Sequence, residues 1–114
     1  MKTDKELLIL AAKAAGLHVK ATAVNTDDDF TGVIIGARHT KQKIIWNPLS
    51  VAGDALQLAV HLDMGTFFHD DGVKVFFKAN GITDFIVEPY GSDKHAATRR
   101  AIVRAAAAIG EQME

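Results

Sequence analysis

The chain has 114 residues, with 13 lysines and arginines against 14 aspartates and glutamates, and nearly half of its residues are apolar. This length predicts one domain, residues 1–114, with a core of its own. The near-neutral charge argues against a dedicated nucleic-acid or membrane-surface protein. Because the sequence has no cysteine, disulfides, thiolate metal sites and cysteine nucleophiles are excluded. No apolar run reaches the length of a membrane span and the first residues do not resemble a signal peptide, so we expect a cytoplasmic protein without a membrane partner.

The first half of the chain predicts two helices separated by short strands. Helical spacing of apolar residues predicts a helix over 4–15, capped by Thr3 or Asp4. Period-two alternation and β-branched residues predict three extended segments, over 17–24, 30–37 and 44–46. Asn47-Pro48 then breaks the extended pattern, and Ser50 is the expected N-cap of a helix over 51–63. That helix is apolar over a wide arc, which favours deep packing or a contact between subunits.

The second half predicts strands over 65–69, 73–78 and 82–87, followed by a final helix. Asp70-Asp71-Gly72 and Asn80-Gly81 are strong turn signals between these strands. Ser92 or Asp93 can cap the last helix, which should run to about residue 110, and residues 110–114 should be frayed. We expect an α+β fold, with one antiparallel sheet of about five to six strands and helices packed on its faces, in the order αββ(β)αβββα.

Two stretches resemble the phage ABA-sandwich domain family of small phage and prophage proteins. They are Trp46-Asn47-Pro48-Leu49 with the following run 53–60, and the run 97–106; the resemblance extends from Leu7 to Ile109. It implies a sheet covered by helices on both faces, a phage or prophage origin, and the host cell cytoplasm as location. It implies no biochemical activity and no catalytic residue. Family members often have acidic residues where this chain has Val51 and Ala52, so no function of an acidic helix start carries over.

Trp46 and Asn47 are the most distinctive local feature. We interpret them as architectural, with Trp46 filling core volume and Asn47 bonding to nearby backbone, while the functional alternative puts Trp46 on a binding surface.

Potential metal ligands and catalytic residues do not form recognisable sets. Asp27-Asp28-Asp29 and Asp70-Asp71 fit solvated turns better than cation sites, because their spacing matches no calcium loop. The five histidines lack a close ligand spacing, and no nucleophile elbow or phosphate loop is found. Gly32 and Gly36 instead suggest close backbone packing or a bulge. We therefore expect no metal, no cofactor and no catalytic residues.

Four basic residues make the start of the last helix locally basic: Lys94, Arg99, Arg100 and Arg104. The helix amides near Lys94 favour anions, so a phosphate or a nucleic-acid backbone could dock there. The alternative, which we favour, is a solvated face balanced by Asp93, Glu111 and Glu114.

The sequence favours a non-enzymatic accessory protein that binds a protein partner or associates with itself. The apolar helix over 51–63 and the Phe67-Phe68 and Phe76-Phe77 pairs offer more apolar surface than three helices and a thin sheet can bury. One alternative is nucleic-acid binding through the basic last helix and Arg38–Lys43. Another is an enzyme whose composite site only the fold assembles.

Overall fold

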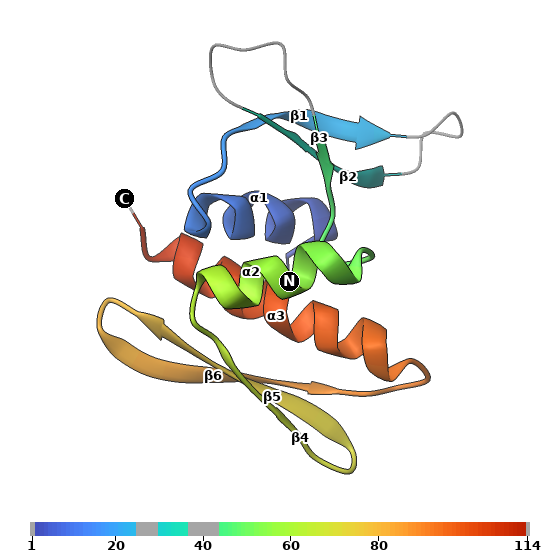
Figure 1. The fold of residues 1–114 in the computed structure, drawn as a ribbon, viewed down its shortest axis with the longest axis vertical. Helices are drawn as coiled ribbons and strands as arrows, with labels where there is room; N and C mark the ends of the chain where they lie inside the picture. Colours follow the sequence, from blue (N-terminus) through green and yellow to red (C-terminus); the bar gives the residue numbers. More distant parts are fainter. Residues whose placement is uncertain (1, 25–29, 37–43, 114) are drawn as a thin grey trace.

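The computed structural model describes residues 2–24, 30–36 and 44–113. This part of the chain forms three helices and six strands, with three strands between each helix and the next. Figure 1 shows their arrangement. In chain order they are α1 (Asp4–Ala14), β1 (Val19–Val24), β2 (Phe30–Ile35), β3 (Ile44–Trp46), α2 (Ala52–His61), β4 (Gly65–Phe68), β5 (Gly72–Ala79), β6 (Ile82–Pro89) and α3 (Lys94–Glu111). The α+β class and the predicted order of elements are confirmed.

The strands form two antiparallel sheets, ordered β1-β2-β3 and β4-β5-β6. The hairpins predicted from the turn signals are confirmed, with β4 paired to β5 and β5 paired to β6 in register. The structure thus divides between two sheets the strands that the sequence analysis placed in one. The physical reason is that α2 follows β3 and the helices occupy the space between the sheets, so β3 and β4 do not meet (Figure 1).

The helices form the middle of the molecule (Figure 1). α1 packs against β1 and β2, α3 packs against β5 and β6, and α1 and α3 pack extensively on each other. This layer order is the reverse of a central sheet with helices on both faces, the arrangement that the family resemblance implies. Within the described chain, no helix has the length and apolarity needed to cross a membrane.

Small residues let α1 and α3 approach closely. Five alanines of the two helices are fully buried: Ala11, Ala12, Ala101, Ala105 and Ala106. Gly110 is also buried, and a Cβ at that position would overlap the carbonyl oxygen of Leu10 in α1. The prediction that the chain frays from residue 110 is therefore wrong at Gly110, because this glycine is part of the seam between the two helices.

Local signals fix most of the helix starts. Thr3 and Glu6 form a capping box at α1, and Asp93 caps α3 by accepting a hydrogen bond from the Ala96 N–H (3.0 Å). At α2 the expected cap, Ser50, is wrong: Val51 occupies the N-cap position and makes no side-chain cap bond. The Asp54 carboxylate, in the first turn of α2, accepts a hydrogen bond from the Asn47 N–H (3.0 Å) in the turn before the helix.

Gly32 has the close-packing role expected of it. A Cβ at Gly32 would lie 2.8 Å from the carbonyl oxygen of Trp46, and the register between β1 and β2 shifts next to its partner, Ala23. The glycine therefore lets β2 approach β3 beside an irregularity of the sheet.

Candidate interaction surface

The arginines of α3, which the sequence offered as an anion site, are each engaged within the molecule. Arg99 Nε donates to the carbonyl oxygen of Leu49 (2.9 Å), which ties α3 to the segment before α2. Arg100 forms an ion pair with Asp4 at the start of α1 (3.0 Å). Arg104 forms an ion pair with Glu88 of β6. These contacts join elements far apart in the sequence, which is a structural role.

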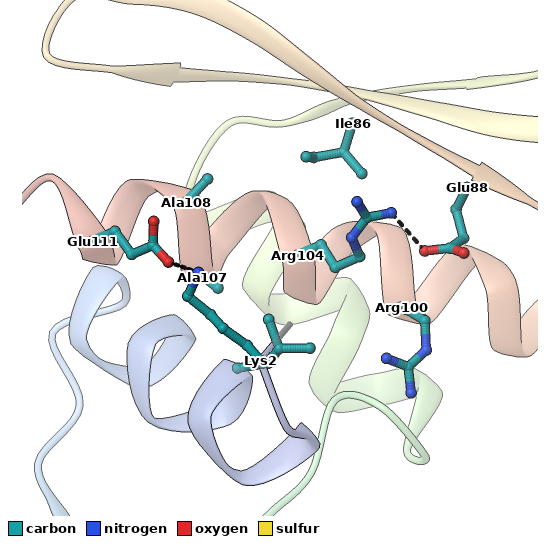
Figure 2. Close-up of a pocket in the computed structure, with 9 residues that line it drawn as sticks. Lys2, Ile86, Glu88, Arg100, Arg104, Ala107, Ala108 and Glu111 are labelled. Atoms are coloured by element: carbon teal, nitrogen blue, oxygen red, sulfur yellow. Dashed lines mark hydrogen bonds and ion pairs between the residues drawn. The ribbon is translucent and has the colours of Figure 1, made fainter.

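Arg100 and Arg104 lie on the wall of a groove of about 530 Å³, which Lys2, Glu88 and Glu111 also line. Arg104 Nη1 donates to Glu88 Oε1 of β6 (2.8 Å), and Lys2 forms an ion pair with Glu111. Figure 2 shows the Arg104 side chain pointing towards Glu88, while Arg100 points to the other side of the groove. Because the cations are matched by carboxylates, an anion would have to displace these carboxylates to bind here.

The N-terminus of α3 is occupied by a carboxylate of the chain itself. The hydrogen bond from the Ala96 N–H holds the pKa of the Asp93 carboxyl below its ordinary value, helped by the His95 N–H and the Arg99 charge. Lys94 Nζ lies over the rings of Tyr90 (4.9 Å to the centroid) and Phe68 (5.6 Å). An incoming anion would therefore compete with Asp93 for the helix amides.

The structure places the Trp46-Asn47 feature inside the molecule. Trp46 is 6% exposed and belongs to the hydrophobic core. The Asn47 side chain donates to the carbonyl oxygen of Thr31 (3.0 Å) and accepts from the Leu49 N–H (3.1 Å). These bonds hold the turn between β3 and α2 against β2.

Within the described ranges, no three histidine, aspartate or glutamate side chains gather in a way that could hold a metal ion. Asp27-Asp28-Asp29 and the segment Arg38–Lys43, considered above for cations and for nucleic acid, lie outside the residues that the structure describes.

The outer face of β4–β6 is a different kind of surface. Directly paired residues of neighbouring strands point to the same side of a sheet. On the inner side of β5, Val73, Val75 and Phe77 are buried against the helices. The opposite side carries seven residues, which we call the aromatic face: Phe67, Lys74, Phe76, Lys78, Thr83, Phe85 and Val87.

Large apolar side chains on this face are open to solvent. Phe67 is 57% exposed, Phe85 48% and Phe76 39%. The rings of Phe76 and Phe85 lie 6.0 Å apart at an angle of 56°, and Lys74 Nζ is 4.5 Å from the Phe85 centroid. In Figure 1 this sheet lies on one side of the helices, so its second face is an outer surface of the molecule.

Sequence reasoning found only part of this surface. It singled out Phe67 and Phe76 as excess apolar residues but did not include Phe85 or the two lysines. The signal was present in the alternation of Lys74, Phe76 and Lys78 with buried residues, and in the Asn80-Gly81 turn. That turn sets Phe85 opposite Phe76.

A second apolar surface lies on α2. Its Ala55, Leu58 and Ala59 are buried, whereas Leu56 (64% exposed) and Val60 (67%) lie one turn apart on the outside. Deep packing, one of the two interpretations of the apolar helix over 51–63, is therefore wrong, whereas a contact between subunits stays a prediction. Beside Leu56, a groove of about 520 Å³ separates α2 from α3.

Comparison with models of protein families, with curated proteins and with solved structures found no match to this chain.

Proposed function

We propose that this protein is a non-enzymatic interaction module that binds another macromolecule through the aromatic face. The observation that carries this proposal is the exposure of Phe67, Phe76 and Phe85 on one continuous sheet face. Contiguous apolar surface of this kind on a small protein usually marks an interaction site. We further propose a phage or prophage accessory protein that acts in the cytoplasm of the host cell; this part is supported by the sequence resemblance alone.

The test compares two matched double variants. F76S/F85S removes two exposed apolar side chains from the aromatic face, and L56S/V60S removes two from α2. All four side chains are more than a third exposed, so both variants should fold, which circular dichroism will verify. Each immobilised chain is incubated with a cell lysate, and the retained material is identified by mass spectrometry and by nuclease treatment.

We expect one macromolecule from the lysate to be retained by the wild type and by L56S/V60S but not by F76S/F85S. Addition of free wild-type chain should displace it. If all three chains retain the same species, the aromatic face is not the binding surface and the proposal fails.

Self-association is a second candidate, and the exposed stripe on α2 favours it. Ala52, Leu56 and Val60 follow one another at intervals of four residues, and none of them is charged, so two copies of the stripe can meet without burying a charge. Light scattering should then give a mass above the monomer for the wild type and for F76S/F85S, and the monomer mass for L56S/V60S. A monomeric wild type would contradict this candidate.

Nucleic-acid binding through α3, the alternative drawn from the sequence, has less support. Arg100 and Arg104 already have carboxylate partners, Asp4 and Glu88, which phosphates would have to replace. Nor does the groove beside these arginines favour an enzyme, since each charged side chain on its walls already forms an ion pair.

A further inference from the structure

The charges on the aromatic face point to the chemistry of its partner; this inference rests on the proposed function. The strand positions that the register assigns to this face include Lys74 and Lys78 but no carboxylate. Glu88 and Asp84 fall at the alternate positions, on the other side of β6, and Glu88 is paired with Arg104. Neither lysine forms an ion pair in the part of the chain that the structure describes. The face therefore presents two uncompensated positive charges.

One of the two positive charges, that of Lys74, lies among the rings, while Lys78 lies further along β5, opposite Thr83. Lys74 Nζ is 4.5 Å from the Phe85 centroid and 5.8 Å from that of Phe76. Lys74 is directly paired with both Phe67 and Val87, and Phe76 stands between Lys74 and Lys78 on β5. A partner that covers the rings must therefore also take up the Lys74 ammonium group, and one that extends along β5 meets that of Lys78 as well.

A second copy of this face does not meet that requirement. Face-to-face pairing would bring the lysines of both copies into one interface, with no carboxylate on either face to pair them. Burying unpaired ammonium groups is unfavourable, and like charges add repulsion. The partner must supply negative charge of its own.

The position of the two large grooves, which lie away from this face, argues against an acidic peptide. Peptide side chains gain most of their affinity by filling pockets, and the two large grooves of about 530 and 520 Å³ are lined by other residues, on α1, α2, α3 and the inner side of the sheet. What this surface offers is three exposed aromatic side chains, with Lys74 over the rings of two of them. Bases stack on such rings whatever their identity, and the backbone phosphates accept the cations.

We propose that the aromatic face binds single-stranded nucleic acid, with bases stacked on Phe67, Phe76 and Phe85 and phosphates beside Lys74 and Lys78. Thr83 is the only neutral hydrogen-bonding side chain among the seven residues of the face. We therefore expect little selection of base sequence and little discrimination between ribose and deoxyribose.

The experiment uses fluorescein-labelled 12-mers of deoxythymidine and of uridine, with a 12-base-pair DNA duplex for comparison, and measures fluorescence anisotropy between 50 and 200 mM salt. Two phosphate contacts to a single strand give a slope of log affinity against log salt of about −1.4. The variant K78Q should reduce that slope to about −0.7. DNA and RNA strands should bind alike and the duplex more weakly, since its bases are not free to stack.

Substitutions at Phe85 separate stacking from simple apolar contact. F85L keeps an apolar side chain and hence the fold, but it has no ring; loss of one stacked base should weaken binding about 5- to 150-fold. F85W keeps a ring and should bind at least as tightly as the wild type. L56S/V60S on α2 and R100Q on α3 are controls that should leave the affinity unchanged.

Several results would overturn this inference: no binding of either strand at 50 mM salt, equal binding by F85L and the wild type, or loss of binding in R100Q alone. Its failure is distinguishable from failure of the proposed function. If the species lost from F76S/F85S in the lysate experiment is a protein, the module stands and the nucleic-acid partner is wrong. If nothing is lost there, both are wrong.

Discussion

Gly110 marks the point where α3 lies against the backbone of α1. A methyl group at this position would overlap the carbonyl oxygen of Leu10, so G110A should separate the two helices or bend them locally. Overpacking of this kind costs about 1–3 kcal/mol. We expect the free energy of unfolding, measured by urea denaturation, to fall by that amount even though alanine is the better helix former.

Gly53 in α2 provides the matched control. It also lies in a helix, but a Cβ there meets nothing within 4 Å. G53A should therefore raise the free energy of unfolding by at most about 0.5–1 kcal/mol, the gain from alanine over glycine in the middle of a helix, because Gly53 lies in the first turn of α2. Equal effects of G110A and G53A would show that the seam between α1 and α3 accommodates a methyl group.

Among the elements, α3 depends on a single acidic cap. Because the pKa of the Asp93 carboxyl is lowered in the folded state, its stabilising effect is fully present above the ordinary value of 3.8. It is lost as the pH falls through the lower folded-state pKa. D93A should therefore have a lower urea midpoint than the wild type at pH 7, and the difference should shrink below pH 3.8 as the carboxyl is protonated.

Ser92 is the control for this cap, since the sequence left Ser92 and Asp93 equally eligible and the structure assigns the cap bond to Asp93. S92A should have the midpoint of the wild type at every pH. A difference between D93A and the wild type that stays constant down to pH 2 would mean that the Asp93 charge does not contribute to the cap.

Elements were predictable where their signals are local. The Thr3 capping box, the Asn80-Gly81 turn and the alternation along β5 each depend on residues within a few positions of one another. The N-cap of α2 was mispredicted: Val51 takes the place expected of Ser50, and no side chain caps the helix. The turn before α2 is instead held by Asp54, which accepts a hydrogen bond from the Asn47 N–H. Which residue occupies the N-cap position depends on how the turn packs against β2, and no local sequence pattern encodes that packing.

Contacts between distant parts of the chain could not be predicted in the same way. The basic residues of α3 were correctly identified as a group, but the pairing of Arg100 with Asp4 spans 96 positions and depends on the packing of α1 against α3. The division of six strands into two sheets likewise depends on how distant parts of the chain pack together. Strand patterns show that each strand has a buried side, and they do not show which helix face covers it.

At the scale of the whole molecule, the two sheets are held together through the helices between them. The fully buried alanines of α1 and α3 form the seam, and buried residues from both sheets belong to one hydrophobic cluster. One half of the molecule consists of α1 with β1–β3, and the other of α3 with β4–β6. If one half unfolds, the helix of the other half exposes the apolar side that it buries in the seam. Cooperative unfolding of both halves is therefore expected.

Trp46 makes this expectation measurable, because the sole tryptophan is buried in the sheet of β1–β3 and reports on that half alone. Unfolding in urea followed by Trp46 fluorescence should coincide with unfolding followed by far-ultraviolet circular dichroism, which senses all helices and strands. V33A removes a fully buried side chain from β2 and should cost about 2 kcal/mol. It should lower both midpoints equally, although Val33 lies in the sheet remote from β4–β6. A fluorescence midpoint that falls while the circular dichroism curve splits into two steps would mean that α3 and β4–β6 remain folded without the other half.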